Sequence, residues 1–304
     1  MQNYQAVTIN HPTITMDQVL KFAPTVYLCN AEPYIPCSIE YILRNSMLCD
    51  EDDSGFQIKS PSQKDLLQYY QEHYYLLIDP KCYDQNCSCY ENPGLDDAIM
   101  YVAVQIPYNK QYVDLKYIFL FAFNGAQTAT ILPPVADDFD CALASYAEHQ
   151  GDIEGITVRV TPDFQQILNV VYEAHGNPTS FNACDIDYEH ETHPKVFCAY
   201  NSHATYNSQG VTGLKDVILE DYSHLDLGVK FVDVISSIGS IWRPFDYDQS
   251  GQAVSNGHLV FVGLDEHDQP INDQYWAKFK GKIGTTKKNS FSQPNSVAGI
   301  ELTD

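Results

Sequence analysis

Basic residues are scarce in this chain of 304 residues, because 17 Lys and Arg stand against 40 Asp and Glu and the formal net charge is −23. A surface this acidic repels the phosphates of nucleic acids and anionic membranes, whereas it tolerates divalent cations and basic partners. Nucleic acid is therefore excluded as an expected partner. The simplest explanation of the charge is that it keeps the folded chain in solution.

Long apolar runs and an apolar leader are also missing. No stretch reaches the ~18 apolar residues that a membrane-spanning helix needs. The first residues, MQNYQAVTINHPTITMDQVL, carry no basic leader and no apolar segment. The sequence therefore predicts no transmembrane segment, no cleaved signal peptide and a cytoplasmic protein. Export by a route that ignores such signals is the alternative.

Motifs of common enzymes and of paired metal-binding cysteines are absent as well. There is no GxSxG elbow, no P-loop and no GxGxxG. The nine cysteines are odd in number and mostly scattered, which favours reduced thiols over a disulfide framework. In KCYDQNCSCY, Cys82, Cys87 and Cys89 lie close together, but without a CxxC pair or an obvious fourth ligand. A polar loop with free thiols is therefore favoured over a zinc site.

What is present indicates a folded protein, since 44% of the residues are hydrophobic and 19% are charged. Short helices are predicted near the N-terminus, with Thr15 and Ser38 as N-caps and a third helix over residues 62–77. From about Asp97 the chain is rich in short runs of Val, Ile, Phe and Tyr separated by turn residues: IMYVAVQI, KYIFLFAF, GITVRV, ILNVVYEA, KVFCAY, LDLGVKFVDVI and HLVFVGL.

This spacing predicts a mainly β fold, an antiparallel β-sandwich with a few short N-terminal helices. The expected organisation is a single domain over residues 1–304. In it, residues 1–95 form a helical and loop portion packed on a sandwich core of residues 96–284, and residues 285–304 form a loose polar tail.

The segment AEHQGDIEGITVRV combines acidic residues and a histidine with the start of a strand. Alternate side chains of a strand share a face, so Asp152 and Glu154 should point the same way, with His149 just before them across Gly151. Carboxylate oxygens suit Mg²⁺, Ca²⁺ or Mn²⁺, and an added imidazole shifts the preference towards Mn²⁺, Zn²⁺ or Fe²⁺. His149, Asp152 and Glu154 are thus candidate metal ligands, and a solvated turn with exposed acids is the alternative.

Three more histidines flank predicted strands. His175 follows ILNVVYEA, His193 precedes KVFCAY and His203 follows it. A sandwich collects its loops at two ends, so His149, His175 and His203 should gather at one end if their strands alternate in direction. Taken singly, each of these residues is better explained as a hydrogen-bonded structural histidine. We add His193 and Asn124 as candidate ligand-binding residues.

Several blocks together resemble the vacuolar protein sorting-associated protein 62 family. They cover residues from about Val19 to Gly284 in the order VLKFAPTVYLCNAEPYIPCSIEYIL, YIFLFAFNGAQ, EHQGDIEGITVRV, VVYEAHG, THPKVFCAYNSHATYNSQG and WAKFKGKIG. The family usually has Trp between the Asp and the Glu, where this chain has Ile153. The resemblance implies a link with vacuolar sorting but no particular reaction.

A weaker likeness points to the necrosis- and ethylene-inducing toxins, β-sandwich proteins with a His-x-x-Asp-Trp-Glu run that helps to bind a divalent cation. This likeness implies that His149, Asp152 and Glu154 are metal ligands and that the cation helps to engage a glycosylated sphingolipid headgroup. Asp137, Asp138 and Asp140 are the alternatives for a further acidic ligand. The disulfide of the secreted toxins is not recognisable here.

Three functions follow as hypotheses. The first is a binding module in which a divalent cation (Mg²⁺, Ca²⁺, Mn²⁺ or Zn²⁺) helps to bind a lipid headgroup, a glycan or a phosphate-bearing ligand, with a role in membrane trafficking or as a secreted effector. The second is a metal-dependent hydrolase of phosphoesters or esters, with His203 and His175 as general acid or base. The third is a metal-free factor that binds a protein partner in vacuolar sorting.

Overall fold

A computed structural model gives the fold of the chain. It describes residues 14–30, 32–78, 89–92, 94–107, 109, 111–126, 128–131, 139–142, 148–219, 227–235, 238–265 and 267–285. Of the positions singled out above, Cys82, Cys87, Asp137, Asp138 and the tail after residue 285 lie outside these ranges. Within them, no helix is long and apolar enough to cross a membrane.

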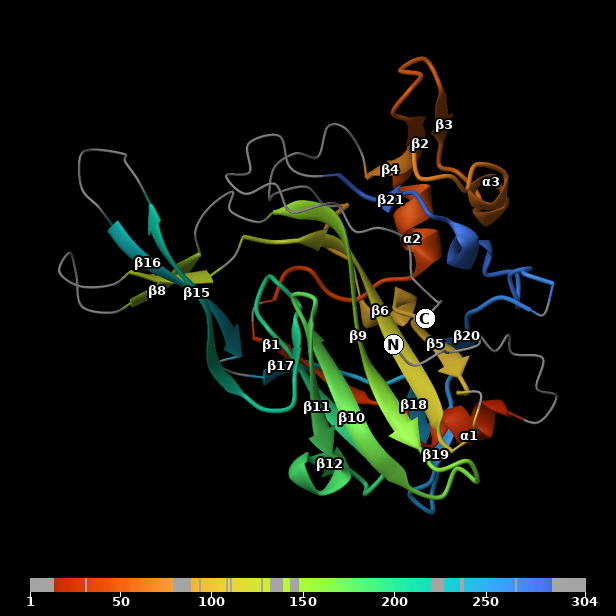
Figure 1. The fold of residues 1–304 in the computed structure, drawn as a ribbon, viewed down its shortest axis with the longest axis vertical. Helices are drawn as coiled ribbons and strands as arrows, with labels where there is room; N and C mark the ends of the chain where they lie inside the picture. The colour runs from red at the N-terminus through yellow and green to blue at the C-terminus, as the bar shows by residue number, and fades with distance from the viewer. Residues whose placement is uncertain are drawn as a thin grey trace.

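Two sheets face each other and enclose the main hydrophobic core (Figure 1). The first contains, in order, β12 (Tyr188–Glu189), β13 (His193–Cys198), β1 (Thr25–Cys29) and β17 (Ile238–Trp242), with β14 (Thr205–Tyr206) paired to β13. The second contains, in order, β11 (Asn177–Asn182), β10 (Ile167–Ala174), β9 (His149–Val160), β6 (Val113–Asn124), β5 (Met100–Gln105) and β20 (Leu259–Phe261). The predicted mainly β sandwich is confirmed.

Most strand pairs are antiparallel, but β1 runs parallel to β13 and β20 runs parallel to β5. The sheets are therefore mixed, which the even spacing of the strands in the sequence did not predict. Because β1 lies inside the first sheet, part of the N-terminal portion is a component of the sandwich and does not merely pack against it.

The six-stranded sheet is covered on both faces, which explains the continuous apolar run of β6. Its odd-numbered residues Tyr117, Phe119 and Phe121 face the core between the sheets, whereas Ile118 and Leu120 face a second core. A strand buried on both faces needs apolar residues at consecutive positions and loses its alternation.

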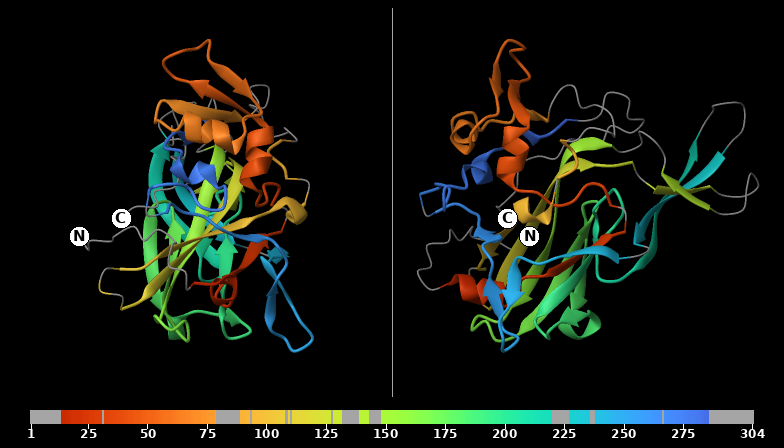
Figure 2. Two further views of the ribbon diagram at one scale, coloured as in Figure 1. Left: turned by 90° about the vertical axis from the view of Figure 1, so that its right-hand side faces the viewer. Right: turned by 180° about the vertical axis from the view of Figure 1, so that it is seen from behind.

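The second core is closed by α2 (Ile39–Arg44), η3 (Tyr275–Lys278) and a small sheet. This small sheet has the order β21 (Lys282–Ile283), β4 (Tyr74–Ile78), β2 (Ser46–Asp50) and β3 (Gln57–Lys59). Figure 2 shows it stacked with α2 at one end of the molecule. Trp276 of η3 is fully buried and packs edge-on against Tyr101 of the sandwich, which joins the two parts.

The N-terminal helices begin where their capping residues predict. Thr15 and Ser38 cap α1 (Met16–Leu20) and α2, and Ser62 caps α3 (Gln63–Gln68). The third helix was predicted too long, because it ends at Gln68 and residues 74–78 form β4. The aromatic and leucine side chains of YYLLI pack better in a strand paired with β2 than in a further helical turn.

The other elements lie around this framework. One sheet contains β15 (Gly210–Leu219), β16 (Leu227–Ile235), β7 (Thr128–Ile131) and β8 (Phe139–Ala142), and β18 (Phe245–Tyr247) pairs with β19 (Ala253–Ser255). Two 3₁₀ turns are η1 (Leu95–Asp97) and η2 (Ala183–Asp185).

Candidate functional site

The first half of β9 carries two carboxylates into the space between the two main sheets. Strand alternation puts Asp152 and Glu154 on the face that holds Ile156 and Val158 further along, and both of the latter belong to the core. The two acids lie opposite Phe121 and Phe119 of β6. The expectation that they share a face is thus met, but the face is an interior one.

Gly151 lets the chain bend just before these acids. Its φ is +67°, and a Cβ at this position would collide with the backbone oxygen of Ile283. His149, which is 8% exposed, places Nδ1 2.7 Å from the carbonyl oxygen of Gly151. The imidazole of His149 is therefore held by the backbone of its own strand.

His203 reaches Asp152 from a tight loop that follows β13. The residue has a positive φ of 56° and is fully buried. Its Nδ1 lies 3.0 Å from Oδ2 of Asp152, and its ring stacks on Phe121 with centroids 3.9 Å apart. The imidazole is thus fixed in both position and plane.

Glu32 is the second acidic partner of this imidazole, and sequence reasoning missed it. Its Oε1 lies 3.6 Å from Nε2 of His203, and its carboxylate also accepts hydrogen bonds from the amides of Asn201 at 2.7 Å and Tyr34 at 3.1 Å. Parallel neighbours end at the same edge of a sheet, so the loops after β1 and β13 bring Glu32 and His203 together. No local pattern marks Glu32.

The two carboxylates keep His203 charged. Burial alone lowers the pKa of the imidazole, but the hydrogen bond to Asp152 and the interaction with Glu32 outweigh burial and raise this pKa to about 9. At neutral pH, His203 is therefore an imidazolium between two carboxylates, and both of its ring nitrogens carry a proton.

Glu154 has no such compensation. Burial raises its pKa well above the ordinary range, and the nearby charges of Asp152, Glu173 and Asp233 raise it further. This part of the sandwich therefore holds more acidic oxygens than its imidazoles can neutralise.

A second pair of acid and imidazole lies beside the first. Asp233 of β16 is fully buried, and its Oδ2 is 2.7 Å from Nε2 of His175. Ser202 donates to Asp233 at 2.7 Å and Tyr206 donates at 2.6 Å. Because Ser202 precedes His203 in the chain, the loop after β13 contacts both pairs.

His175 sits in the hairpin between β10 and β11 and remains accessible. His175 and Gly176 form a two-residue turn with φ values of 51° and 72°, the left-handed geometry that such hairpins require. The side chain is 34% exposed. Burial lowers the pKa of His175, but the hydrogen bond to Asp233 outweighs this effect and raises the pKa overall.

The structure therefore gathers Asp152, Glu154, His175 and His203, together with Glu32 and Asp233, at one end of the sandwich; we call these six residues the acid–imidazole cluster. Among the residues that the structure describes, no three side chains of Asp, Glu, His or Cys are grouped closely enough to hold a metal ion. The assignment of His149, Asp152 and Glu154 as metal ligands stays a prediction.

The remaining candidates lie elsewhere or nearby. His193 begins β13, at the opposite end from His203, and is buried with Nδ1 2.7 Å from the carbonyl oxygen of Ala23. Burial lowers its pKa. Asn124 ends β6 opposite His149 and donates to the carbonyl oxygen of Gly125 at 3.0 Å. Cys89 is half-buried, and Asp140 lies on β8, whose side chains are outside the described part.

The fold and the cluster define a mainly β sandwich protein with an acidic, imidazole-containing site at one end. Residues 2–236 match the family model of vacuolar protein sorting-associated protein 62, and the chain belongs to this family. No curated protein matches the sequence.

Several solved structures match this chain at low similarity. Necrosis and Ethylene inducing Protein 2, from the causal agent of cocoa's witches' broom disease, is 16% identical over 66% of this chain and 75% of that chain, with a TM-score of 0.33. The non-toxic HaNLP3 protein is 13% identical over 99% and 97% of the two chains, with a TM-score of 0.37. NLPPya in complex with mannosamine is 12% identical over 99% and 93%, with a TM-score of 0.39. A likeness at this level does not transfer a function.

Proposed function

We propose that this protein is a binding module that takes up a divalent cation at the acid–imidazole cluster and uses it to bind a lipid headgroup, a glycan or a phosphate-bearing ligand. The observation that carries the proposal is the carboxyl of Glu154 in the interior beside Asp152, where burial raises the pKa of Glu154 and the nearby charge of Asp152 raises it further. A cation would lower the pKa of Glu154 and stabilise the two neighbouring carboxyl groups in their ionised form. It would also attract the oxygen atoms of a ligand, which the chain's net charge of −23 would otherwise repel.

The residues have different roles in this proposal. Asp152 and Glu154 would hold the ion, since carboxylate oxygens suit Mg²⁺, Ca²⁺ and Mn²⁺, and His149 is the adjacent imidazole on the same strand. His203 is not a ligand, because a protonated imidazole has no free lone pair. Its role would be to fix the carboxylate of Asp152 by the 3.0 Å hydrogen bond.

Chelator-treated protein should show a rise in melting temperature and measurable binding heat on addition of Ca²⁺, Mg²⁺, Mn²⁺ or Zn²⁺. Asp152→Asn and Glu154→Gln, which keep the shape of the side chains, should remove both responses. Glu72→Gln, at an exposed position, is the matched control and should respond like the unchanged protein. Equal cation responses of the unchanged protein, the two cluster variants and the control would contradict a cation site in the cluster. The cluster would then have a structural role, and the protein would be a metal-free factor that binds a protein partner.

Ligand binding is tested with the same proteins. Vesicles with and without acidic lipids and a panel of immobilised glycans should be bound by the cation-loaded protein and released by chelator. The rival function is a metal-dependent hydrolase, which would show chelator-sensitive turnover of phosphoesters or esters that His175→Ala abolishes. His175 is the better placed candidate for that role, because its side chain is 34% exposed whereas His203 is fully enclosed.

A further inference from the structure

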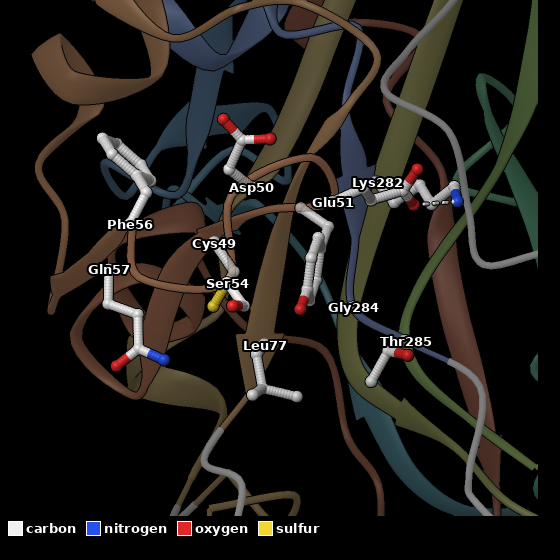
Figure 3. A pocket seen from close by; sticks show the side chains of 11 residues that line it. Cys49, Asp50, Glu51, Ser54, Phe56, Gln57, Leu77, Lys282, Gly284 and Thr285 are labelled. Atoms are coloured by element: carbon white, nitrogen blue, oxygen red, sulfur yellow. Dashed lines mark hydrogen bonds and ion pairs between the residues drawn. The ribbon is translucent and has the colours of Figure 1, made fainter.

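A hollow of about 580 Å³ lies on the outer face of the small sheet, and it shares no lining residue with the acid–imidazole cluster. Its size falls in the range of about 300–1,000 Å³ typical of small-molecule sites. Figure 3 shows Phe56 and Gln57 on one side of it, Thr285 on the other and Leu77 below. We call this hollow the sheet trough.

Strand register builds the floor of the sheet trough. Gln57 of β3 pairs with Cys49 of β2, Cys49 pairs with Tyr75 of β4, and Tyr75 pairs with Lys282 of β21. Paired residues share a face, so these four side chains form one row across the sheet. The next row, Ile58, Leu48, Leu76 and Ile283, packs into the second core. The outward row is therefore polar and aromatic where the inward row is aliphatic.

Three neutral side chains around the trough can form hydrogen bonds and have no such partner in the described part of the chain. Ser54, Gln57 and Thr285 make no side-chain hydrogen bond to any other described residue, and they come from the loop after β2, from β3 and from the segment after β21. Phe56, Tyr75 and Leu77 supply apolar surface between them. Hydroxyl and amide groups around aromatic and aliphatic surface suit a ligand that has both hydroxyl groups and C–H faces.

The charges near the sheet trough favour an uncharged ligand. Glu51 is paired with Lys282 at the rim, as the dashed line in Figure 3 shows. The carboxylate of Asp50 is 12% exposed, accepts from the amide of Asp52 at 2.8 Å and lies 4.0 Å from His73. The run of four acids at residues 50–53 repels anions, and the two acids in the trough already have partners, so a cation gains little.

We propose that the sheet trough is a second, cation-independent binding site that takes a neutral saccharide unit, with its hydroxyl groups on Ser54, Gln57 and Thr285 and a ring face against the aromatic and leucine side chains that line it. The site goes beyond the proposed function, because it uses none of the residues of the acid–imidazole cluster. The trough adjoins the start of β9, where the amide of Gln150 donates to the carbonyl oxygen of Thr285 at 2.8 Å.

The test is binding of neutral and amino sugars in the presence of chelator, by ligand-observed NMR and calorimetry. The probes are glucose, galactose, mannose, N-acetylglucosamine and their β-linked dimers, with glucosamine as the charged comparison. At least one neutral probe should bind, and Gln57→Ala and Ser54→Ala should each weaken it by about 3- to 10-fold, the loss expected for one hydrogen bond. Gln71→Ala, exposed but outside the trough, is the matched control and should leave affinity unchanged.

Asp152→Asn separates this site from the cation site, since it should leave saccharide binding intact even where it removes cation binding. Three results would overturn the proposal: no binding of any neutral probe, equal affinity of Gln57→Ala and unchanged protein, or binding by glucosamine alone. Gln57 and Ser54 are exposed, so their replacement leaves the fold intact, and unchanged melting curves verify this.

Discussion

The two halves of β9 face the same interior space but fill it differently. In the second half, Ile156, Val158 and Val160 pack into the core between the sheets, as the alternating sequence predicts. In the first half, Asp152 occupies the equivalent face with only 5% of its surface exposed, beside a charged imidazole. Hydrophobic burial explains the second half. The first half carries desolvated charge that packing does not require, and such sites are where function is to be sought.

The sharpest test of this contrast is removal of Asp152. Asp152→Ala breaks the buried pair with the enclosed imidazolium of His203 and leaves Glu32 at 3.6 Å as its acidic partner, and breaking a buried ion pair costs about 3–5 kcal/mol. Urea unfolding should show a loss of this size in the free energy of unfolding. If the free energy of unfolding falls no further than after a methyl deletion in the apolar half, the pair of Asp152 and His203 does not stabilise the charged half of the strand.

The contrast should also appear in the pH dependence of stability. The pKa of His203 is about 9 in the folded protein and about 6.5 in the unfolded chain, so its stabilisation is complete below about pH 6.5 and is lost as the pH rises through 9. The shift corresponds to roughly 3 kcal/mol. Unfolding free energies of chelator-treated protein should fall over this window, and His203→Gln should flatten the fall. A profile that keeps the same slope in His203→Gln would assign the dependence to other groups.

The accessible pair of His175 and Asp233 should contribute less to the free energy of unfolding than the enclosed pair of His203 and Asp152. His175→Ala removes one hydrogen-bond donor to Asp233, while Ser202 and Tyr206 remain, so we expect a loss of about 1–3 kcal/mol. Glu72→Ala, at an exposed position, should change the free energy of unfolding by less than about 0.5 kcal/mol. If His175→Ala lowers the free energy of unfolding as much as Asp152→Ala does, the two pairs contribute equally to stability and this prediction is wrong.

The smallest effect belongs to the apolar half. Ile156→Val deletes one methyl group from a fully buried side chain, and such deletions cost about 0.5–1.5 kcal/mol. Urea unfolding should give a value in this range without any change in the response to pH or to cations. A pH-dependent effect of this substitution would mean that the two halves of the strand are coupled.

Local patterns predicted much of the fold and part of the cluster. The alternation in GITVRV gave the strand, the two-residue spacing placed Asp152 and Glu154 on one face, and Thr15 and Ser38 marked helix starts. The predicted length of the third helix was wrong. The aromatic run at its end suits either a helix or a strand, and pairing with neighbouring segments determines which of the two it forms.

The sequence by itself determined which residues share a face, since that depends only on neighbouring positions and the two-residue repeat of a strand. The tertiary structure alone decided which charges meet. Glu32 lies 171 positions before His203 in the chain, and they meet because β1 and β13 run side by side in the same direction. His175 and Asp233 meet across two different sheets. Contacts between distant segments depend on strand order and direction, and no local repeat in the sequence encodes either.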